Sequence, residues 1–208
     1  MRINVPLVKQ EEQCGGAAMS MIYKFFGINL SEEEIIKRVG KMRWGTFTTE
    51  HALMADKLGF NVACYSYNLD LFSTSDLRLP RHELIKKTKE LISKRKRSRE
   101  ILKTTLRALE SNIQFEMKIP SLQIIKDFLN RKLPVGLAVT SAVLKKKKKN
   151  TRWGHFIVIT GYENDKFYYN DPKYGKEFEI SADKLIFAIS CNVIGSSAYL
   201  LVISRTFH

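Results

Sequence analysis

The chain has 208 residues, of which 44% are hydrophobic and 27% are charged, so it can bury one hydrophobic core as a single domain over residues 1–208. Its longest apolar runs, Phe156–Thr160 and Ala198–Ile203, are far shorter than the roughly 20 residues that cross a bilayer, so we expect no membrane span. The net charge of +14 is concentrated in residues 81–112 and in the run Lys145–Lys149, which leaves the rest of the chain nearly neutral.

The N-terminal segment and the cysteines indicate the compartment. The first residues (MRINVPLVKQEEQ) become polar within ten positions and lack the apolar stretch of a signal peptide, so we expect a cytoplasmic location. Cys14, Cys64 and Cys191 are odd in number and widely spaced, which argues against a disulfide framework and against zinc. We expect no metal and no cofactor, and we expect Cys64 and Cys191 to be inert packing residues.

The first half of the chain shows helical periodicity. Apolar residues that follow Cys14 fall on one face of a helix, and Ser31 with Glu34 forms a capping-box pattern for a second helix. The predicted helices begin after Cys14, at Ser31 and at Thr48 or Thr49, and they end at Gly27, Gly40 and Gly59. Phe60–Tyr67 then alternates like a strand.

Residues 81–112 form a basic helical insertion. They hold eleven Lys and Arg against four Glu, and two apolar stripes flank the polar run Ser93–Glu100. This pattern predicts one long helix or a helical hairpin that packs against itself or the domain and leaves its charges in water. If the insertion only decorates the fold, its deletion should leave stability and hydrolysis nearly unchanged.

The second half is predicted to be mostly strands. A helix over Leu122–Leu129 is followed by a strand over Pro134–Thr140. A β-meander then follows, with strands at 155–160, 166–170, 176–180 and 198–204 and a short helix over 181–189. Helices first and antiparallel strands second give an α+β fold, with an N-terminal helical half packed against a C-terminal antiparallel sheet.

Cys14 has the surroundings of a catalytic thiol. It stands at the predicted start of a helix, where the helix macrodipole favours a thiolate, and Gly15 and Gly16 follow it. The two glycines would let a substrate backbone approach and leave their amide groups free. The pattern indicates a nucleophile, which a nearby imidazolium would activate further.

His155 and Asp171 are the candidate partners of Cys14. His155 lies 141 residues after Cys14, in the order and range that papain-type enzymes show. A hairpin turn centred near Glu163 would place positions 155 and 171 opposite each other within one residue of register, with β-carbons about 4.5–5.5 Å apart. Asp171 would then orient the imidazole. A core histidine and a plain Asp-Pro turn are the alternative interpretation of these two residues.

Two blocks of sequence carry a family resemblance. VPLVKQEEQCGGAAMSMIYKFFG and the distant GHFIVITGYENDKFYYNDPKYG resemble the papain-like cysteine peptidases related to the double-glycine (bacteriocin) leader peptidases. The resemblance covers residues 5–27, 120–140 and 153–175 and leaves the basic insertion outside it. It implies a papain-like fold with a Cys14 nucleophile, a His155 general base and an orienting Asp171.

The resemblance also implies a glutamine in the oxyanion hole. The family places it about six residues before the cysteine, but that position here is Val8. We therefore assign the role to Gln10, with Gln13 as the alternative, and the backbone amide of Cys14 would be the second donor.

The resulting prediction is a cysteine peptidase that cleaves a peptide bond in a peptide or protein substrate. An acyltransferase with the same triad and a non-catalytic basic binding module on the same fold are the alternatives. No transporter membrane or ATPase domain is present, so we do not expect cleavage coupled to export. For the basic insertion we favour an acidic substrate or partner over nucleic acid, because it lacks interleaved aromatic residues and any known nucleic-acid motif.

Overall fold

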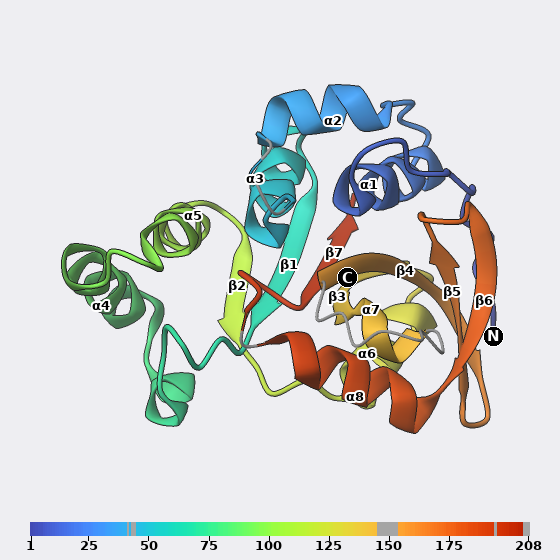
Figure 1. Ribbon diagram of the computed structural model, residues 1–208. Helices are drawn as coiled ribbons and strands as arrows, with labels where there is room; N and C mark the ends of the chain where they lie inside the picture. Colours follow the sequence, from blue (N-terminus) through green and yellow to red (C-terminus); the bar gives the residue numbers. More distant parts are fainter. Residues whose placement is uncertain (41, 43–44, 145–153, 194, 206–208) are drawn as a thin grey trace.

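The computed structural model describes residues 1–40, 42, 45–144, 154–193 and 195–205, and the run Lys145–Lys149 lies outside them. Its strands form one seven-stranded sheet in the order β2-β1-β7-β3-β4-β5-β6 (Figure 1). The strands are β1 (Asn61–Ser66), β2 (Gln114–Met117), β3 (Val135–Thr140), β4 (Gly154–Glu163), β5 (Lys166–Asp171), β6 (Lys176–Ser181) and β7 (Leu200–Ser204). The helices are α1 (Cys14–Phe25), α2 (Glu32–Val39), α3 (Thr48–Lys57), η1 (Thr74–Arg78), α4 (Arg81–Lys94), α5 (Arg99–Glu110), α6 (Leu122–Asn130), α7 (Ser141–Leu144) and α8 (Ala182–Val193).

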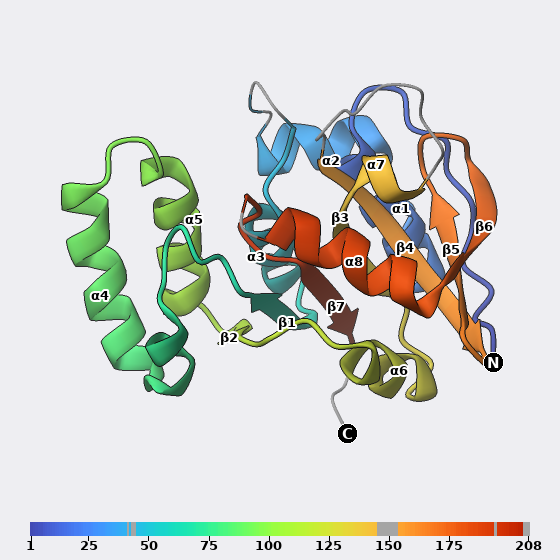
Figure 2. The same cartoon turned by 60° about the horizontal axis from the view of Figure 1, so that its bottom comes forward.

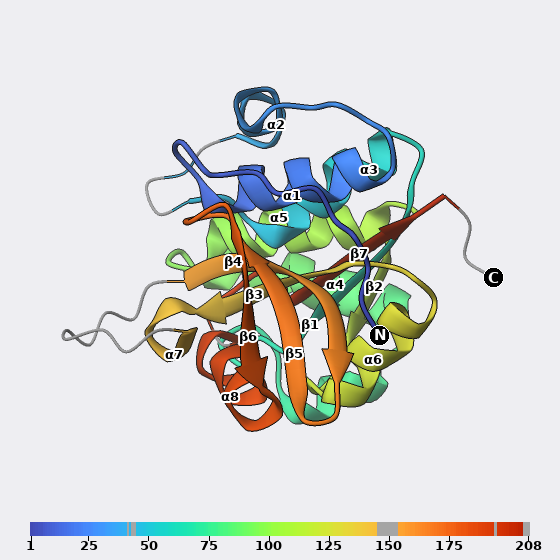
Figure 3. The ribbon, with the colours of Figure 1, turned by 90° about the vertical axis from the view of Figure 1, so that its right-hand side faces the viewer.

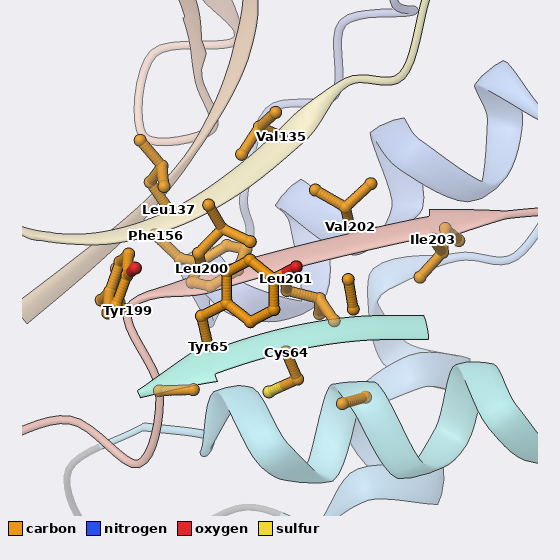
Figure 4. Packing of buried hydrophobic residues seen from close by; sticks show 14 of the residues in the cluster. Cys64, Tyr65, Val135, Leu137, Phe156, Tyr199, Leu200, Leu201, Val202 and Ile203 are labelled. Carbon is orange, nitrogen blue, oxygen red and sulfur yellow. The ribbon is translucent and has the colours of Figure 1, made fainter. Parts of the chain in front are cut away.

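The sheet is covered on both faces. Helices α1 and α3 lie on one side of it, and α6 and α8 lie on the other (Figure 3). Every residue of β3 is buried, which explains why this strand is a continuous apolar run rather than an alternating one. Figure 4 shows the centre of the core, where side chains such as Cys64, Phe156 and Leu201 from neighbouring strands pack together. Strand β4 contributes to this core, and both β4 and the neighbouring β5 carry candidate functional residues near their ends.

The predicted α+β class is confirmed, and two details of the sheet differ from the expectation. The predicted strand at 60–67 is β1, which pairs antiparallel with β7 and so joins the strands of the C-terminal half in one sheet. Strand β2 was not predicted, and it pairs parallel with β1. Its four residues, QFEM, are too few for a periodic pattern to identify them.

The helix starts follow the sequence signals in part. Ser31 and Glu34 form the predicted capping box at α2. The predicted cap of α3 by Thr48 or Thr49 is wrong, because Phe47 is the N-cap residue and no side chain caps this helix. Thr49 Oγ1 lies instead 2.9 Å from Thr104 Oγ1 of α5, in a buried contact between the two helices.

The basic insertion is a helical hairpin of α4 and α5, which extends to one side of the sheet (Figure 2). Helix α5 packs against α3, and the buried side chains of Leu84, Leu102 and Leu109 belong to the main core. Arg81 is exposed, as expected for the charges of the hairpin, but its side chain also makes contacts that were not predicted. Its guanidinium donates to the backbone carbonyls of Ala108, Leu109, Ser111 and Ile113 at 2.7–3.1 Å, and so it caps the C-terminal end of α5.

Candidate active site

Cys14 is the first residue of α1, a helix that is buried from Gly15 to Tyr23 while Cys14 itself stays partly exposed. The two glycines have a packing role that the sequence analysis did not predict. A β-carbon on Gly15 would lie 2.7 Å from His51 Nε2, and one on Gly16 would lie 2.9 Å from Ile36 Cγ1. The glycines therefore let the start of α1 approach α2 and α3 closely, which fixes the place of Cys14.

His155 and Asp171 lie side by side at one end of the sheet. His155 is the second residue of β4 and Asp171 is the last residue of β5, and His155 Nε2 lies 2.8 Å from Asp171 Oδ1. The backbone N–H of Lys173 donates to the same carboxylate oxygen at 3.0 Å, which holds its orientation. Both side chains are largely buried, with 9% of His155 and 3% of Asp171 exposed, so water competes little for this hydrogen bond.

The predicted register of this pair is wrong by two residues. Val158 pairs with Asn170, so the ladder places Asp171 opposite Ile157 rather than opposite His155. The turn lies at Asn164 and Asp165 rather than near Glu163, which moves the register by three residues, and a register shift between Ile159 and Gly161 reduces this to two. Positions 155 and 157 point to the same face of the sheet, and long side chains reach a diagonal neighbour. The contact therefore forms across the diagonal.

The imidazole of His155 interacts with both Asp171 and Cys14. Burial is the largest single influence on its pKa and lowers it, but the hydrogen bonds and negative charges of Asp171 and Cys14 together raise the pKa to about 9. Since Nε2 bonds to Asp171, Nδ1 is the ring nitrogen left for Cys14. At neutral pH His155 is an imidazolium, the state that stabilises a neighbouring thiolate.

A cavity of about 820 Å³ opens over these residues. Cys14, His155 and Asp171 all line it, together with residues 45–48, the end of α8 and residues 195–197. This volume suits a segment of peptide rather than a single small ion.

Gln10 and Gln13 also line the cavity, and they have different neighbours. The backbone N–H of Gln10 donates to the carbonyl of Pro172 at 2.8 Å, which ties it to the loop after Asp171. Its side-chain Oε1 is buried and has no hydrogen-bond partner among the described residues. Gln13 Oε1 instead approaches Gly45, within 3.4 Å of the place where a β-carbon would stand.

The other cysteines and histidines are outside the candidate triad, although His51 lies close to it, beside Gly15 and Thr46. Cys64 is buried as expected, but the expectation that Cys191 is a packing residue is wrong, because it is exposed on α8. His51 is buried and lies 2.7 Å from Thr46 Oγ1, and burial lowers its pKa to about 4, so it is neutral. His82 is exposed, and His208 lies outside the described residues.

Glu32 is the residue near the site that sequence reasoning missed. Its buried carboxylate accepts hydrogen bonds from the backbone of residues 11–13, directly before Cys14. In the sequence it is one of three glutamates in the first turn of α2, and nothing in the pattern distinguishes it from Glu33.

Comparisons with known proteins relate the fold and the first part of the chain to one group of peptidases. Residues 2–90 match the model of the Peptidase C39 family, a segment that holds Gln10 and Cys14 and ends before His155 and Asp171. This chain is related to the C39 peptidases. The predicted resemblance to the leader peptidases and the predicted class, a papain-like cysteine peptidase, are confirmed by this match and by the fold.

Solved structures share the fold of this C39-like chain at low sequence identity. One is a double-glycine-motif protease from an AMS/PCAT transporter, in complex with the leader peptide (TM-score 0.52, 15% identity, 99% of this chain and 94% of that chain). Another is a C39-like peptidase from Bacillus anthracis (TM-score 0.56, 13% identity, 100% of both chains). No curated protein matches the sequence. Within the described ranges, no helix is long and apolar enough to cross a membrane.

Proposed function

We propose that this C39-like chain hydrolyses a peptide bond with Cys14, His155 and Asp171 as its catalytic triad. The observation that supports this most directly is the position of the His155 imidazole, which interacts with Cys14 on one side and Asp171 on the other. The three side chains also line one cavity. This is the arrangement of nucleophile, base and orienting group that acyl transfer requires.

The reaction has two halves. The Cys14 thiolate attacks the carbonyl carbon of the scissile bond, and the resulting oxyanion collapses as the carbon–nitrogen bond breaks and the His155 imidazolium gives its proton to the leaving amine. This leaves an acyl group on Cys14 as a thioester and a neutral His155. A water molecule then gives a proton to His155 and attacks the thioester, which releases a carboxylic acid and restores the thiolate.

Gln10 is our proposed side-chain donor to the oxyanion, together with the backbone N–H of Cys14. Replacing Gln10 with alanine should lower kcat by about 100-fold, because the lost hydrogen bond forms chiefly in the transition state. Gln13→Ala is the matched control, since Gln13 lines the same cavity from the side of Gly45. Steady-state kinetics on both variants measure the effect. A larger loss in Gln13→Ala would transfer the role to that residue.

The proposed substrate is a peptide or protein segment that lies in the cavity, whose lining includes residues 45–48 and residues 195–197. The structural neighbour in complex with a leader peptide supports a peptide ligand on this fold. The chain should be incubated with a library of peptides in H₂¹⁸O, with and without added amines, and the masses of the products measured by mass spectrometry. Hydrolysis places ¹⁸O in a new carboxyl group. Formation of amides at the expense of acids would favour the acyltransferase, and no cleavage at all would favour a binding module.

We propose further that the turn of the α4–α5 hairpin contacts an acidic segment of the substrate or a partner. Several cations of the hairpin are already paired, such as Lys87 with Asp76 and Lys89 with Glu110. Among the described residues, Lys94, Lys96 and Arg97 make no ion pair, and all three are exposed at the turn between the helices. Unpaired charge is therefore densest at this end of the hairpin.

The double variant Lys94→Glu/Arg97→Glu should weaken binding of acidic peptides to the Cys14→Ala protein by about tenfold, and the wild-type affinity should fall as salt is raised. The control Lys57→Glu/Lys184→Glu makes the same charge change at exposed lysines of α3 and α8. Titrations at two salt concentrations measure both. Equal binding of acidic peptides by the two double variants would contradict the assignment. Tighter binding of duplex DNA or RNA than of acidic peptides would show that the partner is a nucleic acid instead.

A further inference from the structure

Three consecutive backbone amides converge on the carboxylate of Glu32. Its Oε2 accepts from the N–H of Glu11 at 2.7 Å, and its Oε1 accepts from the N–H of Glu12 at 2.8 Å and from the N–H of Gln13. Only 7% of Glu32 is exposed, and no cation pairs with it among the described residues. Hydrogen bonds to a buried carboxylate are among the stronger ones in proteins, so these three amides are held firmly.

The clamped segment connects the two groups that would bind the oxyanion. Residues 11–13 separate Gln10 from Cys14, and the N–H of Ala17 bonds to the carbonyl of Gln13 as α1 begins. The N-cap residue Gln13 has no side-chain cap, so nothing in its own side chain fixes the start of this helix. Glu32 supplies that constraint from a neighbouring helix.

Glu32 is itself held in place by the packing of α1 against α2. A β-carbon on Gly16 would lie 3.0 Å from Glu32 Cγ, so the two helices approach as closely as a glycine permits. As the first residue of α2, Glu32 also stands at the helix end that favours negative charge. The carboxylate therefore occupies one fixed position relative to the start of α1.

We infer that Glu32 is a positioning residue, which sets the Cys14 backbone amide and the Gln10 side chain in the geometry that binds the oxyanion. This inference rests on the proposed function of the triad. A residue of this kind changes the reaction without touching the substrate, because a displacement of about 1 Å in an oxyanion donor costs much of its effect. Its loss should lower kcat and leave KM nearly unchanged, because the oxyanion forms only during the reaction and is absent when the substrate first binds.

The test is Glu32→Gln beside Glu33→Gln, its exposed neighbour in the same helical turn. Glutamine keeps the shape of Glu32 but replaces one acceptor oxygen with a donor, so it cannot bind all three amides. We expect kcat to fall at least tenfold in Glu32→Gln, with KM within about twofold, and to stay at the wild-type value in Glu33→Gln. In a Gln10→Ala background, the further loss from Glu32→Gln should be much smaller than tenfold, because both changes damage one site.

Two outcomes would overturn the inference in an enzyme whose wild type is active: the same kcat in both variants, or a rise in KM with kcat unchanged. If Glu32→Gln does not fold, Glu32→Asp replaces it, because it keeps the carboxylate and withdraws it by one methylene. The same fall in kcat at constant KM is then expected, and its absence overturns the inference. Failure of the proposed function is distinguishable, since the wild type itself would then show neither turnover nor acylation of Cys14.

Discussion

Replacing His155 with alanine should lower peptide hydrolysis by at least about 10⁴-fold, because the same side chain generates the thiolate and protonates the leaving amine. Asp171→Asn should cause a smaller loss, since an amide can still accept a hydrogen bond from Nε2 and orient the ring. Measurement of kcat/KM on a cleaved peptide tests both. His82→Ala is the control, because His82 is exposed in the basic hairpin. Turnover that survives in His155→Ala would contradict the triad.

The pH profile separates the charge of Asp171 from its orienting role. The pKa of His155 is raised to about 9, so the imidazolium persists below that pH and is lost as the pH rises through it. The wild-type kcat/KM should therefore fall on the alkaline side with a midpoint near pH 9. In Asp171→Asn the carboxylate charge that favours the imidazolium is gone, so this midpoint should move to lower pH. An unchanged midpoint would show that Asp171 does not act through its charge.

Leu102→Ala should lower the free energy of unfolding by about 2–5 kcal/mol, the usual result of opening a cavity at a buried leucine. Leu102 lies in α5 and is fully buried in the main core. Lys103→Ala is the matched control on the same helix, where an exposed side chain contributes about 0.5 kcal/mol or less. Urea denaturation of both variants measures the difference. Equal stability of the two would mean that the hairpin is an independent appendage.

The packing of α5 changes what deletion of residues 81–112 should do. The sequence alone allowed a decorative insertion whose removal leaves stability nearly unchanged, but α5 contributes Leu102, Ala108 and Leu109 to the core. It also reaches the candidate site through hydrogen bonds. Thr104 Oγ1 contacts Thr49 Oγ1 at 2.9 Å, and the N–H of Thr49 donates to Ser197 Oγ, which lines the cavity. Loss of the hairpin should therefore disturb the cavity wall as well as the core.

The sequence identified the candidate triad because each member carries a local signal. Cys14 precedes two glycines at a helix start, and His155 and Asp171 lie on the two strands of an obvious hairpin, both at the end away from its turn. The exact register was not predictable, because the turn lies at Asn164 and Asp165 rather than near Glu163, and because the register shift between Ile159 and Gly161 leaves no mark in a buried run. The predicted pair is nevertheless in contact, because the side chains of His155 and Asp171 reach each other across the diagonal.

Other features depended on tertiary contacts that no local pattern encodes. The importance of Glu32 arises only when α2 packs beside residues 11–13. Strand β2 forms because β1 offers it a free edge, not because QFEM favours a strand strongly. The exposure of Cys191 is different, since Leu185, Ala188 and Ile189 define the buried face of α8 and helical spacing alone places residue 191 away from it.

Mapping of a mechanism-based label tests the central claim most directly. The folded protein should be treated with a peptidyl vinyl sulfone, digested and analysed by mass spectrometry for the modified cysteine. We expect an adduct on Cys14 that is lost in His155→Ala, while buried Cys64 and exposed Cys191 stay unmodified. Cys191 is the internal control for simple exposure. Labelling of Cys191 as fast as Cys14, or labelling of Cys14 that does not depend on His155, would contradict the proposed mechanism.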